Sequence, residues 1–149
     1  MNSKAIIVEA IFNSSAEKIW KAISDKNEMK KWYFDLAEFK AELGFKFEFT
    51  GGPAPERQYI HRCQITEVVA EKKLAYSWCY DGYDGYSLVS FELFAQGNAT
   101  RIKLSHSGIE TFSAANPDFA KINFEKGWAQ IINISLKEYL ENCEMKKNT

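Results

Sequence analysis

Two histidines are the residues of this sequence best suited to acid–base chemistry. His61 and His106 each lie in a segment where apolar and polar residues alternate. On that alternation they share with Ile65 and Leu104 the face that we assign to the interior. A histidine in a pocket can bond a ligand hydroxyl or carbonyl, or shuttle a proton. The alternative is a structural histidine at a strand end that bonds to the backbone, and the sequence leaves both hypotheses open.

Metal, phosphate and covalent chemistry lack the spacings that they need. The two histidines occur without an HxH or HExxH motif, so a metal site would need a carboxylate ligand that no pattern supplies. Gly51-Gly52 is followed by neither a lysine nor a helix, so it is not a phosphate-binding loop. Cys63, Cys79 and Cys143 are widely spaced, and Cys63 is expected to be a buried thiol. We therefore expect no metal and no cofactor.

Aromatic side chains are the more informative set. The eleven Phe, seven Tyr and four Trp must fill a large core or line an apolar cavity. A tyrosine hydroxyl inside such a cavity needs a hydrogen-bond partner, which a ligand oxygen could supply. The predicted ligand-binding residues combine rings near the loops, the two histidines and the first half of the last helix: Phe49, Tyr59, His61, Trp78, Tyr80, His106, Phe112, Phe124, Trp128, Ile131 and Ile132.

Charge and cysteine content narrow the classes of partner. The 19 basic and 20 acidic residues give a net charge of −1, which offers no electrostatic basis for binding nucleic acid or an anionic membrane. The short apolar stretch at the amino terminus is broken by Glu9 and does not predict a signal peptide. No run approaches the roughly eighteen apolar residues of a membrane span. An odd cysteine count without a disulfide pattern favours a cytoplasmic location.

The first third of the chain is predicted to begin with a strand at residues 5–12. Ser14 is the expected N-cap of a helix, with Glu17 at the capping-box position, and a second short helix covers residues 26–32. Residues 36–50 are predicted to hold two short strands joined by a turn near Gly44.

The middle of the chain is predicted to be a series of strands. The Gly- and Pro-rich segment 51–55 reads as a loop inside the domain, because the strand pattern resumes a few residues later. Alternation predicts further strands at residues 58–69, 73–80, 87–94 and 100–106.

A long amphipathic helix is predicted near the end of the chain. Asp118 is its expected cap, and apolar residues follow a helical period from Phe124 to Leu140. Gly127 inside it costs roughly 1 kcal/mol relative to alanine. This glycine indicates a close approach by another chain segment or by a ligand, or else a tolerated local weakness.

The order of elements predicts an α+β fold. Consecutive strands joined by short turns form an antiparallel meander, and its aromatic face needs a cover. The last helix is the only long amphipathic element left to provide one. We therefore expect a single domain over residues 1–149, with a core of about 5–142, in which a curved antiparallel sheet wraps around that helix.

Four segments, in this order, carry a resemblance to a known family. They are AEKIWKAISDKNEMKKW at 16–32, ITEVVAEKKLAYSW at 65–78, SLVSFELFAQGNATRIKLSHSGIE at 87–110 and GWAQIINISLKEYLE at 127–141. Together they resemble the activator of Hsp-90 ATPase homologue-like family. That family is a branch of the START-like (SRPBCC, helix-grip) superfamily, which also includes polyketide cyclases and pathogenesis-related plant proteins.

The resemblance implies about seven antiparallel strands, a long C-terminal helix and a hydrophobic cavity between them. We expect binding rather than catalysis: a small or medium hydrophobic ligand, such as a lipid, an aromatic or a polyketide-like compound, entering beside residues 107–117. One alternative is a co-chaperone-like protein-interaction domain with a chaperone as partner. Another is a cyclase- or hydrolase-like enzyme that uses His61 or His106. Monomer and homodimer both remain open.

Overall fold

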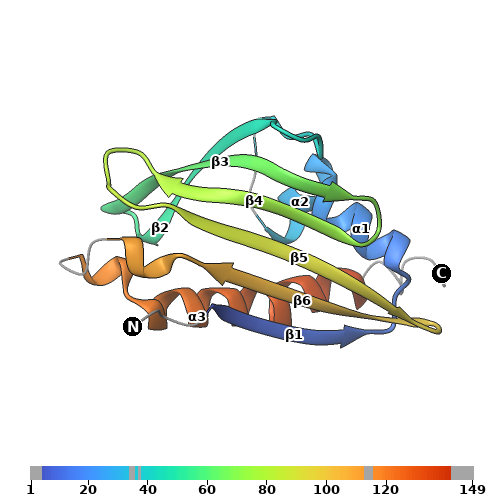
Figure 1. Ribbon diagram of the computed structural model, residues 1–149. Coiled ribbons are helices and arrows are strands. Elements are labelled where there is room, and N and C mark those ends of the chain that lie inside the picture. The colour runs from blue at the N-terminus through green and yellow to red at the C-terminus, as the bar shows by residue number, and fades with distance from the viewer. Residues whose placement is uncertain (1–4, 34–35, 37, 113–115, 142–149) are drawn as a thin grey trace.

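The structure, a computed structural model, describes residues 5–33, 36, 38–112 and 116–141 (Figure 1). Six antiparallel strands form a sheet in the order β1-β6-β5-β4-β3-β2. This α+β helix-grip arrangement confirms the predicted fold class, with six strands in place of seven. The elements in chain order are β1 (Ile6–Phe12), α1 (Ala16–Ser24), α2 (Lys26–Trp32), β2 (Lys46–Ala54), β3 (Arg57–Val69), β4 (Lys73–Tyr80), β5 (Ser87–Gln96), β6 (Ala99–Ser107), the 3-10 turns η1 (Ile109–Thr111) and η2 (Pro117–Phe119), α3 (Lys121–Gln130) and the π-helix η3 (Ile131–Leu136).

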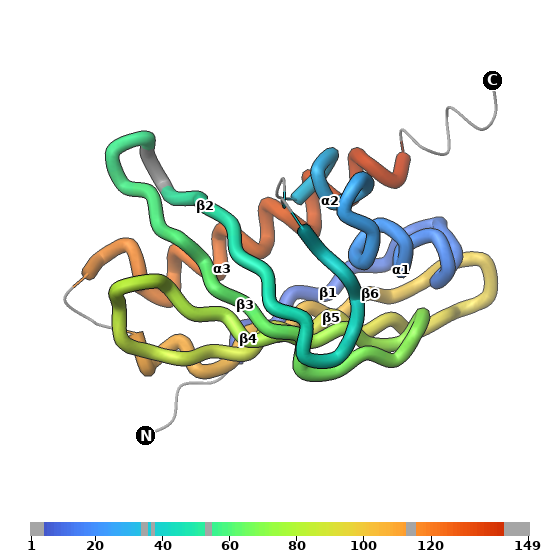
Figure 2. Tube along the Cα trace, turned by 90° about the horizontal axis from the view of Figure 1, so that it is seen from above, coloured from blue at the N-terminus to red at the C-terminus, as the bar shows by residue number. Residues whose placement is uncertain are grey.

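The alternation predicted for the four central strands is confirmed. Their inward residues are buried and form one face of the core, against which the C-terminal helix packs. The helix lies on the same side of the sheet as α1 and α2 (Figure 2). The buried inward residues of β3 to β6 are His61, Cys63, Ile65, Leu74, Tyr76, Trp78, Tyr80, Val89, Phe91, Leu93, Thr100, Ile102, Leu104 and His106.

The strand predicted before Gly44 is absent from the described residues, and this accounts for the missing seventh strand. Leu36 and Phe39 are both buried but lie three positions apart, whereas one face of a strand repeats every two residues. The Phe39 ring packs edge-on against Phe47 with centroids 5.0 Å apart. The segment therefore adds side chains to the core without joining the hydrogen-bonded sheet. The second predicted strand is confirmed as the start of β2.

The prediction of a loop at residues 51–55 is wrong, because β2 runs through the glycines to Ala54. The ladder pairs Gly51 with Tyr59 and Ala54 with Arg57, with a bulge between the two pairs. A Cβ added at Gly52 would lie 1.9 Å from the Arg57 carbonyl oxygen, so the two strands meet here only because this residue has no side chain. An edge strand tolerates such a bulge. The hairpin thus carries Arg57 on the start of β3.

Helix α1 begins one residue later than predicted. The Ser15 hydroxyl, not that of Ser14, accepts the N–H of Lys18 at 3.1 Å and caps the helix. Ser14 is instead buried against β6, where its carbonyl accepts the hydroxyl of Thr100 at 2.8 Å. This contact holds the β1–α1 connection to the sheet.

Helix α2 has the predicted bounds. The Asp25 carboxylate caps it by accepting the N–H of Asn27 at 2.8 Å. Trp32 at its end donates its indole N–H to the Ala22 carbonyl at 2.9 Å and so ties α2 to α1.

The C-terminal helix changes its winding in the middle. Along an α-helix, four residues exceed one turn by about 40°, so a stripe of buried residues at strict four-residue spacing would drift around the helix. The π-helix η3 has a wider turn, which offsets this drift and keeps the stripe on the sheet. The buried stripe consists of Phe124, Trp128, Ile132, Leu136 and Leu140.

Asp118 does not cap this helix, contrary to the prediction. Helix α3 begins at Lys121, with Ala120 at the N-cap position and no side-chain capping bond. Asp118 lies in the preceding turn η2, where its N–H donates to the Asn116 side-chain oxygen at 2.9 Å. Its carboxylate points instead toward β3.

Candidate functional site

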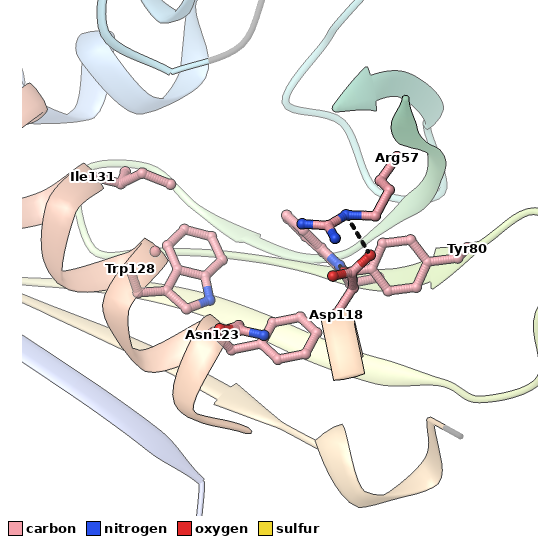
Figure 3. Close-up of a pocket in the computed structure, with 9 residues that line it drawn as sticks. Arg57, Tyr80, Asp118, Asn123, Trp128 and Ile131 are labelled. Atoms are coloured by element: carbon pink, nitrogen blue, oxygen red, sulfur yellow. Dashed lines mark hydrogen bonds and ion pairs between the residues drawn. The ribbon is translucent and has the colours of Figure 1, made fainter. Parts of the chain in front are cut away.

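An open pocket of about 400 Å³ lies where α3 faces the start of β3 and the end of β4 (Figure 3). A volume of this size, lined by rings and a few polar groups, is typical of small-molecule sites. Two further hollows, of about 540 and 630 Å³, lie at the turn between β3 and β4 beside the end of β5, and on β2 to β4 around Arg62. The pocket is lined by Arg57, Trp78, Tyr80, Asp118, Asn123, Phe124, Gly127, Trp128 and Ile131.

Aromatic rings form the inner wall of the pocket. Trp78 of β4 and Trp128 of α3 meet with centroids 5.6 Å apart, so sheet and helix close against each other behind the opening. Phe124 and Tyr80 extend the wall on the helix and sheet sides. All four side chains are buried, so the core packs around each ring and only a small edge of it reaches the opening.

A polar group of four side chains borders the opening. The Tyr59 hydroxyl donates to Asp118 Oδ2 at 2.6 Å, and Arg57 Nε lies 3.5 Å from the same oxygen. Asn116 donates its side-chain amide to the Tyr59 oxygen at 3.2 Å. The hydrogen bond to the carboxylate raises the pKa of Tyr59 above its ordinary value. The Asp118 carboxylate thereby contacts two side chains of β3. Figure 3 shows its ion pair with Arg57 at the pocket.

Gly127 is a position on the helix side of the pocket without a side chain. A Cβ built at this position has no heavy atom within 4 Å, so no described chain segment approaches the glycine closely. Of the hypotheses that the sequence left open, a close approach by another segment is therefore wrong. What adjoins Gly127 is the open space of the pocket.

His106 is part of a buried hydrogen-bonded relay behind the pocket wall. The indole N–H of Trp128 donates to His106 Nδ1 at 2.9 Å, so the ring proton is on Nε2, which lies 2.8 Å from Ser87 Oγ. The Ser87 hydroxyl in turn donates to the Trp78 carbonyl at 2.8 Å. Burial lowers the pKa of His106 to about 3, which keeps the ring neutral. Both ring nitrogens are engaged, and the relay holds the two tryptophans of the pocket.

His61 lies beneath the wall and bonds to the backbone. Its Nδ1 lies 3.1 Å from the Tyr59 carbonyl oxygen and 3.3 Å from that of Phe49, so this nitrogen carries the proton and donates to both. The imidazole stacks on the Phe49 ring with centroids 4.4 Å apart. Burial lowers its pKa to about 4. The described residues that line the pocket include neither histidine.

The buried tyrosines obtain their hydrogen bonds from within the chain. Tyr33 and Tyr76 share a bond of 2.7 Å between their hydroxyls, and Trp78 donates its indole N–H to the Tyr80 oxygen at 2.9 Å. Among the described residues, no buried side-chain nitrogen or oxygen lacks a partner. A ligand oxygen is therefore not required to satisfy the core.

Two of the three cysteines lie in the described part of the chain, and both are free. Cys63 is a buried free thiol as predicted, and burial raises its pKa well above the usual range. Cys79 is also free, and Cys143 lies outside the described residues. Within the described ranges, no group of three or more His, Cys, Asp or Glu is placed to hold a metal ion. No helix in that part of the chain is long and apolar enough to cross a bilayer.

The pocket brings together about half of the predicted site residues. Phe112 is buried beside it and stacks on Phe124 with centroids 6.0 Å apart, whereas Ile132 is fully buried toward the sheet. Sequence reasoning missed Arg57, because segment 51–55 looked like a loop, and Asp118, which looked like a helix cap. The predicted residues that line the pocket are Trp78, Tyr80, Phe124, Trp128 and Ile131. Those that lie behind or beside it are Phe49, Tyr59, His61, His106, Phe112 and Ile132.

Comparison with known proteins places the chain among proteins of related sequence and fold. The model of the family described as Activator of Hsp90 ATPase homolog 1-like protein matches residues 13–141. Among curated proteins, none matches this chain.

Several solved structures share the fold over nearly the whole chain. MLL2253 from Mesorhizobium loti is 23% identical with a TM-score of 0.76, covering 93% of this chain and 98% of that one. BH1534 from Bacillus halodurans is 28% identical with a TM-score of 0.72, covering 93% and 99%. The Aha1 dimer from Colwellia psychrerythraea is 20% identical with a TM-score of 0.69, covering 93% and 97%.

Proposed function

This chain belongs to the Activator of Hsp90 ATPase homolog 1-like family, and we propose that it binds a small or medium hydrophobic molecule in the pocket beside α3. The ligand class includes lipids, aromatic compounds and polyketide-like compounds. The observation that carries this proposal is an opening of about 400 Å³ with buried rings as its wall and a bare helix position at Gly127.

The separation of apolar and polar groups in the pocket supports binding of a mainly apolar ligand. Contact with the ring edges of Trp78, Phe124 and Trp128 would remove apolar ligand surface from water, which is the main source of affinity in such sites. The polar groups lie at one end of the opening, so they would orient the ligand without interrupting the apolar wall.

The placement of the two histidines favours a binding role over a catalytic one. His106 is fully buried with both ring nitrogens bonded inside the chain, and His61 donates to two carbonyls beneath the wall. A general acid or base must come within hydrogen-bond reach of the proton that it moves. Neither ring is placed on the described pocket lining, so we propose a binding role for the site.

The proposal is tested by filling the pocket. Gly127→Leu adds a side chain where a Cβ meets no neighbour, and it should raise helix stability by roughly 1 kcal/mol while occupying the open volume. Lys126→Leu adds the same side chain at an exposed position outside the pocket and serves as the control.

The readout is a thermal-shift screen of hydrophobic compounds, followed by isothermal titration of each hit. Compounds that bind the wild type and the Lys126→Leu variant should lose binding to the Gly127→Leu variant. If the Gly127→Leu variant binds the same compounds with the same dissociation constants, the pocket is not the ligand site.

A second candidate is a protein-interaction domain with a chaperone as partner. The observation that favours it is an exposed apolar pair on the edge strand β1, where Ile7 is 54% and Ile11 61% exposed. Such side chains on a sheet edge suit a protein contact. The test is stimulation of the ATPase of the host's Hsp90-type chaperone, which the Ile7→Thr/Ile11→Thr variant should lose. No stimulation by the wild type would remove this candidate.

A further inference from the structure

We infer that the ligand of this pocket is an acid: an apolar molecule with a carboxylate that the Arg57 guanidinium binds at the mouth. The inference rests on the proposed function and adds the chemical class of the ligand. It comes from the distribution of charge and of hydrogen-bond donors around the opening (Figure 3).

Arg57 is the cationic side chain among the described residues that line the pocket. Its side chain is 55% exposed, and its Nε lies 3.5 Å from Asp118 Oδ2. A guanidinium has five N–H donors in one plane, and its outer edge fits a carboxylate with two parallel hydrogen bonds. Among the described residues, the contact of Arg57 with Asp118 is made through Nε and no hydrogen bond from either Nη is found, so that outer edge is available to a ligand.

Asp118 orients Arg57 and does not offer a site for a cationic ligand. Its side chain is only 12% exposed, and one carboxylate oxygen already accepts the Tyr59 hydroxyl and faces the guanidinium. An ammonium ligand would share this carboxylate with partners already in place and would also meet the positive charge of Arg57. A ligand carboxylate would instead hydrogen-bond to the outer edge of the guanidinium, while Asp118 contacts its Nε.

Most other donors on the lining are occupied inside the chain, and the two that are left, the Tyr80 hydroxyl and the second Asn123 amide N–H, are neutral. The indole N–H groups of Trp78 and Trp128 bond to Tyr80 and to the buried imidazole behind them. The Asn123 amide donates to the Pro117 carbonyl at 2.8 Å. The principal anchor for a ligand oxygen is therefore Arg57, and its removal should abolish the preference for an acid.

The experiment compares three probes with the same ring system and different charge: 2-naphthoate, 2-naphthamide and 2-naphthylmethylammonium. Dissociation constants are measured at neutral pH by isothermal titration. A bidentate charge-assisted pair contributes enough to make 2-naphthoate bind wild type about tenfold or more tightly than the amide. In the Arg57→Gln variant the naphthoate should bind no better than the amide.

A matched control lies on the same strand. Arg62 of β3 faces the opposite side of the sheet, where it pairs with Glu48 at 3.6 Å and Asp81 at 3.2 Å. Arg62→Gln removes the same charge, and it should leave all three dissociation constants unchanged. Arg57→Lys keeps the charge but loses the fork, so it should retain only part of the preference for the acid.

Each outcome decides the inference. Equal binding of the acid and the amide by wild type overturns it, as does a preference for the ammonium probe or a preference for the acid that survives Arg57→Gln. In those cases the pocket still binds an apolar ligand and the proposed function stands. If none of the three probes binds, the inference is overturned, and the proposed function is then judged by the Gly127→Leu screen alone.

Discussion

At the scale of single residues, the polar groups of the core act on the pocket through its rings. Trp128 and Trp78 are joined by His106 and Ser87, so three side chains from α3, β6 and β5 and the Trp78 carbonyl of β4 form one hydrogen-bonded unit. Because the unit is buried and satisfied, each member depends on the others. The histidine thus positions tryptophans. From the sequence, its place on an inward strand face was equally compatible with this role and with contact to a ligand.

Removing the serine of this relay should destabilise the fold. In Ser87→Ala the buried Nε2–H of His106 and the Trp78 carbonyl both lose their partner, so we expect a loss of about 1–3 kcal/mol in the free energy of unfolding. Urea titration followed by tryptophan fluorescence measures it. Ser90→Ala, on the outward face of the same strand, is the control and should change stability little. Equal stability of the two variants would contradict the relay.

The two histidines also predict how stability depends on pH. Burial lowers the pKa of His61 to about 4 and that of His106 to about 3, against about 6.5 in the unfolded chain. Both are therefore neutral in the folded state while the unfolded state takes up protons below pH 6.5. Their contribution is fully present above that pH and is lost as the pH falls toward 4 and then 3.

The pH window from 6.5 to 5 isolates this effect, since most carboxylates titrate below it. The free energy of unfolding should fall there with a slope that approaches about 1.4 kcal/mol per pH unit for each histidine. Urea titrations at pH 7, 6 and 5 measure the slope. A flat profile would mean that both rings take up protons in the folded protein as they do in the unfolded chain, and half the slope would mean that one does.

Elements were predictable where one periodicity dominates, and not where a local feature overrides it. The strands β3 to β6 and helix α2 follow clear alternation or capping signals. Segment 51–55 has loop composition, yet it extends β2 because an edge strand accepts a bulge with two glycines and a proline. That error also hid Arg57, since a strand that reaches residue 57 places this side chain on the same face as Tyr59.

The bulge at Gly52 gives a prediction for the hairpin that carries Arg57. A methyl group in Gly52→Ala would lie 1.9 Å from the Arg57 carbonyl oxygen, so the backbone must move. We expect a loss of about 1–3 kcal/mol in stability and weaker binding of 2-naphthoate because Arg57 shifts. The control is Gly127→Ala, the same change at a position without neighbours, which should stabilise by roughly 1 kcal/mol. Effects of equal sign in the two variants would contradict this account.

At the scale of the whole molecule, the site lies where distant parts of the chain meet outside the hydrogen-bonded sheet. The strands β3 to β6 are each paired on both sides, whereas η1 and η2 are short turns between β6 and α3. Across the opening, Tyr59 reaches Asp118, 59 positions along the chain. The order of elements predicted which surfaces meet, but not how completely the rings fill the interior, because that depends on side-chain packing throughout the core.

This contrast predicts a pattern of amide hydrogen exchange. Amides of the central strands β4, β5 and β6 should exchange only through global unfolding, while the turns η1 and η2 should open locally at much lower free energy. An apolar acid bound at the pocket would contact α3 and the start of β3 together. Saturating 2-naphthoate should therefore slow exchange in η2, in α3 and around Arg57, and leave the turn between β3 and β4 unchanged. Mass spectrometry of peptic fragments resolves these segments. Protection centred on the outer face of β2 to β4 would contradict the proposed site and indicate binding in the hollow on that face. The two sites can be told apart because that hollow shares no lining residue with the pocket beside α3.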